Sequence, residues 1–170
     1  MSRYSSVTPK TIETLLDYGA SSQQVDQLNI PALHDLGFNG EGIRVAVFDA
    51  GFSRLGHESL SSLNIAETWD FVNNDSDVSD GLDMGIGEHG IHTLSSIAGY
   101  SPGNLIGPAF GATFYLAKTE NTEQNNHLDE DNWCAAMEWA EQRGVQIIAS
   151  SLNYTEFDEG NSYAPSDMDG

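Results

Sequence analysis

The sequence predicts an α/β protein built on a mostly parallel β-sheet with right-handed connections. Strand and helix patterns follow one another along the chain in the order strand, strand, helix, strand, helix, strand. Residues 43–48 form an almost continuous apolar run, rich in β-branched types, between Gly42 and Gly51. Such a run is typical of a short strand buried on both faces, as the strands of a parallel sheet are.

Composition excludes several classes of partner. At 170 residues and 18.4 kDa, the chain suffices for one domain, or a large part of one, with a sizeable core. It contains no run of about 18 apolar residues, so no membrane span is predicted. The net charge of −20, from 26 acidic and 6 basic residues, excludes nucleic acid and anionic membranes as partners. A solubilising surface is the simpler interpretation of this charge, and a preference for cationic substrates is the alternative.

Three short helices are predicted ahead of the first strand. Helical patterns cover residues 11–18 and 22–28. Residues 31–37 form a third pattern, with proline in its first turn and glycine at its end. His34 lies in this third helix, and we interpret it as an ordinary surface residue.

The next two elements lie on either side of an acidic loop. Apolar and polar residues alternate over residues 65–72, which predicts a second strand. Residues 88–99 predict a helix, and Leu94, Ile97 and Ala98 fall on one face of it at i, i+3, i+4 spacing. We expect this face to be buried.

The second half of the chain predicts a strand, a helix and a further strand. The strands cover residues 113–118 and 145–152, and the second reads as a central strand buried on both faces. The helix between them starts with three acids at residues 129–131, where the helix dipole favours them. The single cysteine, Cys134, falls on its apolar side and is expected to be inert core. The face expected to pack in the core carries Trp133, Ala136, Met137 and Ala140.

Two residues that can carry chemistry stand at the ends of these elements. Asp49 ends the first strand, on the side where open α/β sheets place their ligands. His89 stands at the entrance of the helix over 88–99, where its ring can face a cleft. Each has a structural alternative, because a carboxylate can cap a turn and a histidine beside a glycine often serves packing.

The loop over residues 73–83 is the most acidic segment and has a metal-binding alternative. Its Asp spacing is similar to that of calcium-binding loops, with Asp75, Asp77 and Asp80 as candidate ligands. The bidentate Glu that closes an EF-hand is missing at the required distance, so a solvated loop is the other interpretation. We expect no metal or other cofactor in the chemistry and leave structural calcium open.

Three ordered motifs resemble those of the subtilisin-like serine peptidases, the subtilases. Residues 45–51 are similar to the family's Asp motif and residues 89–92 to its His motif, in which the first histidine is catalytic. Residues 144–153 resemble the strand that ends in the family's substrate-binding segment. The matching catalytic positions are Asp49 and His89.

The resemblance implies a fold, a domain division and a function. The fold is three-layered, with helices on both faces of a mostly parallel sheet that is incomplete on its C-terminal side. Residues 29–170 would be the N-terminal part of a peptidase domain, and residues 1–28 a helical extension. The activity would be that of a serine endopeptidase, with Asp49 orienting His89 as the base. A peptide or protein substrate would pair as an added strand with Ser151, Leu152 and Asn153.

Two catalytic parts of the family have no match in these 170 residues. They are the Gly-Thr-Ser-type nucleophile motif and the Asn-containing oxyanion segment, which in the family lie C-terminal to the matched part. The expected partner is therefore the C-terminal remainder of the peptidase domain, covalent or as an associated fragment. We expect the chain alone to be inactive. A non-catalytic pseudo-peptidase or peptide-binding module is the alternative.

Three further expectations follow from the resemblance. Secretion is typical of the family, so we expect a secreted or cell-surface protein whose leader is absent from this sequence. Asn153 stands where the family has glycine, and asparagine is the next best residue for a left-handed backbone. Without neighbouring strands, the edge of the strand over 145–152 would be exposed and would favour association.

Overall fold

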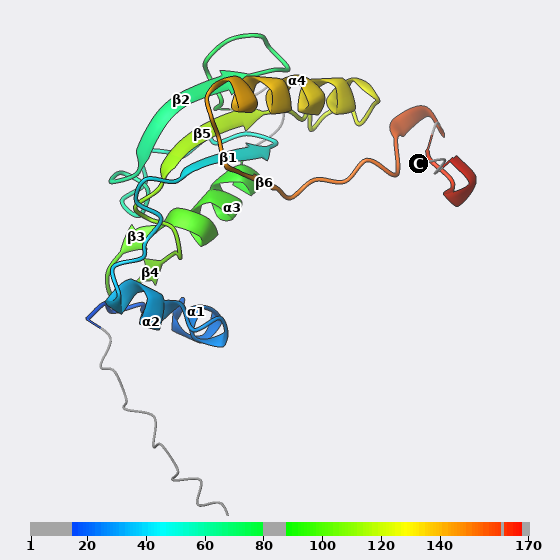
Figure 1. Ribbon diagram of the computed structural model, residues 1–170. Helices are drawn as coiled ribbons and strands as arrows, with labels where there is room; N and C mark the ends of the chain where they lie inside the picture. The colour runs from blue at the N-terminus through cyan, green and yellow to red at the C-terminus, as the bar shows by residue number, and fades with distance from the viewer. Residues whose placement is uncertain (1–14, 80–87, 161, 168–170) are drawn as a thin grey trace, which may run out of the picture.

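A four-stranded parallel sheet, in the order β2-β5-β1-β6, forms the centre of the structure (Figure 1). The computed structural model describes residues 15–79, 88–160 and 162–167. The predicted α/β class and mostly parallel sheet are confirmed. The strands are β1 (Arg44–Asp49), β2 (Asn64–Asp70), β5 (Thr113–Lys118) and β6 (Ile147–Ser150).

One helix covers each face of the sheet. The side chains of β1 alternate between the two faces, as strand geometry requires. On one face, Val45 and Val47 pack in a core cluster with residues of α3 (Glu88–Ala98). On the other face, Ala46 and Phe48 pack with residues of α4 (Leu128–Gln142) (Figure 1). The three layers expected from the sequence are therefore present.

The smaller elements pack below the sheet. Helices α1 (Ser22–Gln27) and α2 (Ile30–Asp35) lie close to a short hairpin, β3 (Tyr100–Ser101) and β4 (Leu105–Ile106) (Figure 1). The hairpin was not predicted, because each of its strands has two residues and no period to detect. The helix predicted over 11–18 is wrong for residues 15–18, which are not helical. Residues 11–14 lie outside the described residues.

His34 joins these smaller elements, so its assignment as a surface residue was wrong. It is half-buried, and its Nδ1 lies 2.7 Å from the hydroxyl of Tyr18. Its Nε2 lies 2.9 Å from the carbonyl oxygen of Pro108, and its ring meets the edge of Phe110. The imidazole thus connects α2 to two segments that are distant in the sequence.

Strand β6 is exposed along one edge and is not buried on both faces, as expected for the strand over 145–152 without its neighbouring strands. It stands at the edge of the sheet, pairs only with β1 among the described strands, and is shorter than expected. Ile147 is 53% exposed and Ile148 40%. The apolar run is therefore correct as a strand signal, and the expected exposure of one strand edge is present in the described part of the chain.

Helix α4 is turned slightly from its predicted orientation. Ala136, Trp139 and Ala140 are buried against the sheet, whereas Met137 is 41% exposed. Cys134 is also exposed, so its assignment to the core was wrong. The helix packs on the sheet through a narrow stripe, and residues beside that stripe reach solvent.

The chain ends in an extended segment with two short 3₁₀ turns, Asp158–Gly160 and Pro165–Asp167. The segment returns to the loop before α4, since Asn125 donates to the carbonyl oxygen of Glu156 at 2.6 Å. No helix in the described part of the chain is long and apolar enough to cross a membrane.

Candidate active site

Asp49 and His89 meet where the C-terminal end of β1 reaches the first turn of α3. Asp49 is fully buried, and its Oδ1 accepts a hydrogen bond from the backbone N–H of Ala50 at 2.7 Å. The same oxygen lies 2.7 Å from Nδ1 of His89, although the two residues are 40 positions apart. The structure thus brings together the two residues that the sequence proposed as a pair.

Gly90 permits this close approach. A Cβ atom on Gly90 would stand 2.2 Å from the carbonyl oxygen of Gly51 and 3.1 Å from Cβ of Asp49. The first of these contacts is with backbone, which cannot move aside as a flexible side chain would. Because only a glycine fits, the first turn of α3 can lie directly against the end of β1. The glycine that follows the histidine is therefore a packing requirement of the pair.

The imidazole of His89 lies partly in solvent. Its side chain is 57% exposed, while the carboxylate that it contacts is inaccessible. With Nδ1 donating to Asp49, the tautomer is fixed and Nε2 is left as an acceptor for another group. Such an arrangement can take a proton from a hydroxyl placed at Nε2.

A cavity of about 400 Å³ lies beside this imidazole. His89 forms part of its wall, and the three residues that follow β6 form another part. The structure therefore places His89 and the three expected substrate-binding residues around one cavity, and Asp49 adjoins it through its contact with His89. The remaining wall residues are Ala50, Glu120, Asn121, Thr122, Asn125 and Asp129, and those after β6 are Ser151, Leu152 and Asn153.

Asn153 does not use the left-handed backbone that the sequence suggested. Among the described residues, only Asn29 and Asn74 combine a side chain with a positive φ. The side chain of Asn153 instead closes a turn, because its Oδ1 accepts hydrogen bonds from the backbone N–H and the hydroxyl of Thr155. Asn153 therefore matches the family position in the sequence, but its backbone is not left-handed as expected.

Two acidic residues of the cavity wall were missed from the sequence. Burial raises the pKa of Glu120, and the nearby charges of Asp129 and Asp49 add to the effect. Burial also raises the pKa of Asp129, against backbone hydrogen bonds from Asn121 and Asn126 that lower it. The position of Glu120, shortly after β5 at the carboxyl edge of the sheet, was a signal that could have found it, whereas Asp129 lies in the first turn of α4.

A buried ion pair lies at the same edge of the sheet. Lys118 and Asp70 are inaccessible, with 3.6 Å between the ammonium and the carboxylate. Strand register places both Asp49 and Asp70 opposite Lys118 on its two neighbouring strands. Burying three charged groups in one row costs desolvation energy, which close pairing offsets. The sequence signal for this pair is a lysine that ends an apolar strand pattern.

The candidate calcium loop is described only in part. Asp80 lies outside the described residues. Oδ1 of Asp75 accepts a hydrogen bond from the backbone N–H of Asp77, and Oδ1 of Asp77 accepts from Ser79. These are turn-closing bonds, and the bonds from Ser79 lower the pKa of Asp77. Within the described ranges, no group of three or more His, Cys, Asp or Glu could hold a metal ion. Calcium binding stays a prediction.

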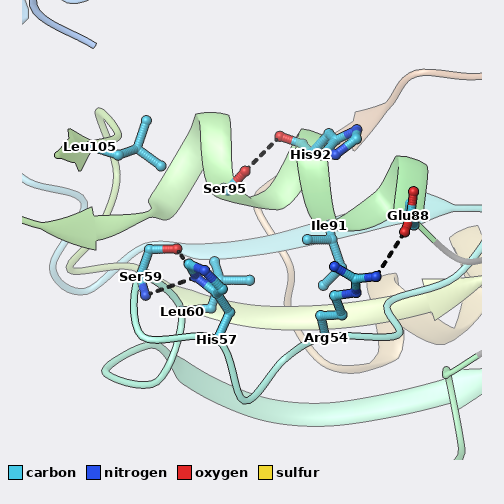
Figure 2. A pocket seen from close by; sticks show the side chains of 9 residues that line it. All are labelled: Arg54, His57, Ser59, Leu60, Glu88, Ile91, His92, Ser95 and Leu105. Carbon is cyan, nitrogen blue, oxygen red and sulfur yellow. Dashed lines mark hydrogen bonds and ion pairs between the residues drawn. The ribbon is translucent and has the colours of Figure 1, made fainter. Parts of the chain in front are cut away.

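A second cavity, of about 350 Å³, lies along another side of α3 (Figure 2). An ion pair of 3.1 Å between Arg54 and Glu88 closes one end of it. At the other end, Nδ1 of His57 lies 2.8 Å from the hydroxyl of Ser59. Neither Asp49 nor His89 lines this cavity, and we assign no catalytic role to His57.

Comparison with known proteins adds an independent finding. The pattern that defines the subtilase family matches residues 40–169. Subtilisin BL and Subtilisin Savinase from Lederbergia lenta are each 27% identical to this chain over 129 residues. Subtilisin E from Bacillus subtilis (strain 168) is 28% identical over 131 residues.

The matched segment is a larger share of this chain than of its relatives. It covers 75% of this chain, but 44% of the two Lederbergia proteins and 31% of Subtilisin E. The alignment thus spans less than half the length of each of these relatives.

Proposed function

This chain belongs to the subtilase family, and from that premise we propose that Asp49 and His89 are the base half of a serine endopeptidase triad. The 2.7 Å contact between Nδ1 of His89 and Oδ1 of Asp49 is the observation that supports this role most strongly. The burial of Asp49 adds to it, because a hydrogen bond is electrostatically stronger away from water.

The pair would act through proton transfer. Nε2 of His89 takes the proton of a hydroxyl as that hydroxyl attacks a peptide carbonyl, and later gives it to the leaving amine. Asp49 holds the tautomer and stabilises the imidazolium that forms. We assign the hydroxyl and the oxyanion donors to the C-terminal remainder of the peptidase domain, covalent or as an associated fragment. We also propose that this enzyme works outside the cell.

The substrate would be an extended peptide or protein segment. The backbone of Ser151, Leu152 and Asn153, beyond the end of β6, can form main-chain hydrogen bonds with an added strand. Because these three residues share a cavity with His89, a peptide paired there would bring a carbonyl group near the imidazole. This reasoning supports a binding role for the segment after β6.

A chimera tests the catalytic proposal. Residues 40–169 would replace the matched segment of Subtilisin E, and hydrolysis of a fluorogenic peptide would be measured. We expect activity that Asp49→Asn lowers by about four orders of magnitude, as loss of the orienting carboxylate does in serine peptidases. A folded, active chimera that is indifferent to Asp49→Asn and His89→Ala would overturn the proposal.

The isolated chain gives the matching negative control. Residues 1–170 alone should not hydrolyse a peptide ester at a useful rate, because nucleophile and oxyanion donors are both large catalytic contributions. Turnover by the purified chain that a serine-directed phosphonate blocks would contradict this.

A non-catalytic peptide-binding module is the second candidate. The exposed edge of β6 favours it, because strand addition needs no nucleophile. Peptide binding to a chain whose chimera stays inactive, although folded, would favour this alternative.

A further inference from the structure

The wall of the cavity beside His89 carries acidic side chains and no Lys or Arg among its described residues. The acidic residues are Glu120 and Asp129. The one other titratable group in that wall is the imidazole of His89. A ligand that enters this cavity therefore meets negative charge on one side and the proposed base on another.

The two carboxylates differ in the hydrogen bonds that they already accept. Asp129 is buried in the first turn of α4, and its two oxygens accept from the backbone N–H groups of Asn121 at 3.2 Å and Asn126 at 3.4 Å. Those bonds hold the loop that enters the helix, which is a structural task. Asp129 is therefore a poor choice for contact with a ligand.

Glu120 is held differently. Its Oε1 accepts hydrogen bonds from the hydroxyl of Tyr154 at 2.5 Å and from that of Thr119 at 3.1 Å. These neutral donors fix the orientation of the carboxylate without cancelling its charge. Tyr154 follows the segment after β6, so the wall residue and the strand edge are fixed relative to each other.

The environment of Glu120 favours an added cation. It is half-buried, and burial together with the charges of Asp129 and Asp49 raises its pKa. An ionised Glu120 thus has two like charges nearby, and an ammonium or guanidinium group in the cavity would relieve that repulsion. A large apolar group would instead desolvate the carboxylate without supplying an opposite charge.

We infer that Glu120 determines specificity at this cavity, selecting peptides that place a lysine or arginine side chain in it. The inference rests on the proposed function, since it assumes that a peptide lies along the segment after β6 and past His89. The cavity of about 400 Å³ has room for one long side chain and its charged end. The selected class is therefore basic peptides or proteins, which also suits the net charge of −20.

A peptide scan with the purified chain tests this inference. Short labelled alanine peptides would carry one lysine at successive positions, and matched peptides would carry norleucine, which has an alkyl chain of similar length and no charge. Binding would be measured by fluorescence anisotropy near neutral pH at moderate salt. We expect one position at which lysine binds about tenfold more tightly than norleucine, the effect of a charge-assisted hydrogen bond in a partly exposed site.

Two variants separate a local effect from general attraction to an acidic chain. Glu120→Gln keeps an acceptor for Tyr154 but removes the charge, and should reduce the lysine preference to within about twofold. Glu123→Gln removes the same charge from an exposed position of the same loop, outside the cavity wall, and should leave the preference unchanged.

The outcomes distinguish this inference from the proposal on which it rests. If norleucine and lysine peptides bind equally at every position, Glu120 is not selective, while the peptide-binding role stands. If Glu120→Gln and Glu123→Gln lower the preference alike, the attraction is general and the inference is wrong. If no peptide binds the chain at any accessible concentration, the inference fails together with the peptide-binding role.

Discussion

At the scale of single residues, the site depends on one glycine as much as on its two functional side chains. Gly90 allows the backbone of α3 to approach the end of β1, and this approach sets the 2.7 Å contact between His89 and Asp49. A histidine anchored in this way has one nitrogen engaged and the other exposed. A general base needs that asymmetry.

Replacement of Gly90 should therefore lower the stability of the fold and disturb the contact between His89 and Asp49. The added Cβ of Gly90→Ala meets backbone at 2.2 Å, so α3 must shift. We expect a loss of about 1–3 kcal/mol in the free energy of unfolding, the usual cost of overpacking. Denaturant titration measures this loss.

Gly56→Ala is the matched control, because nothing lies within 4 Å of its added Cβ and its φ is not positive. It should change stability by no more than about 0.5 kcal/mol. Equal effects of the two substitutions would contradict the packing role of Gly90.

Glu120 should weaken the fold at neutral pH. Its pKa is raised by burial and by Asp129 and Asp49, whereas the hydroxyls of Tyr154 and Thr119 oppose the rise. A carboxyl group whose pKa is higher in the folded state stabilises the fold at low pH, and that contribution is lost as pH rises through the folded pKa.

Glu120→Gln should therefore be more stable than the native chain at neutral pH, by at most about 1 kcal/mol after allowance for solvent screening. The difference should disappear below about pH 4, where the carboxyl is protonated in both states. Thermal melts of both proteins across this range measure it. A variant that is less stable at neutral pH would contradict the account.

At the scale of elements, the outer helix α4 is attached to the sheet at its last turn. Arg143 pairs with Glu67 of β2 through two nitrogens, one of them Nε at 2.7 Å. Its guanidinium also lies 4.4 Å from the ring centre of Trp139. The hydrogen bonds from Arg143 lower the pKa of Glu67. This two-point contact joins the end of α4 to β2, which lies at the edge of the sheet opposite β6.

Loss of this contact should be measurable, and loss of a simpler ion pair should not. Arg143→Ala removes a bidentate pair and a stacked ring, and we expect a cost of about 1–2 kcal/mol. Arg54→Ala removes one contact to Glu88 between two exposed side chains and should cost no more than about 0.5 kcal/mol. Chemical denaturation of the two variants compares them, and the reverse order of costs would be inconsistent with this attachment.

The elements also show what sequence patterns could and could not predict. Strand β1 was predicted because a strand buried on both faces appears in the sequence as a continuous apolar run. The buried face of Leu94 and Ala98 in α3 was predicted because a helix buried along one side has apolar residues at helical spacing. The apolar run of β6 predicted a strand but not the identity of the strand beside it, because such a run carries no information on which neighbour covers it. The same limit explains Met137 and Cys134, since the helical period fixes a stripe only to within one residue on either side.

The site divides in a similar way. Asp49 and His89 were proposed from motifs that name residue types, and the structure brings them together. Glu120 was missed although it follows the strand pattern of β5, and the pair formed by Lys118 and Asp70 was missed because their meeting depends on strand register. Register is a long-range property, and no local pattern in the sequence encodes it.

At the scale of the whole molecule, charge is the dominant feature. A net charge of −20 on 170 residues creates self-repulsion that opposes the compact state. It also opposes association through the exposed edge of β6, which would otherwise attract a second strand.

Salt should therefore stabilise this protein. Raising the ionic strength from about 0.05 M to about 0.5 M shortens the screening length several-fold, so the melting temperature should rise. Scanning calorimetry over a sodium chloride series measures the trend. A melting temperature that falls with salt would show that favourable ion pairs outweigh the net repulsion.

The central claim is that a buried carboxylate fixes the tautomer of one exposed imidazole. Nitrogen-15 NMR of the histidine side chains, in the native chain and in Asp49→Asn, tests it most directly. The account predicts that neutral His89 carries its proton on Nδ1 in the native chain and loses this preference in the variant. A His89 ring protonated on Nε2 in both proteins would contradict it.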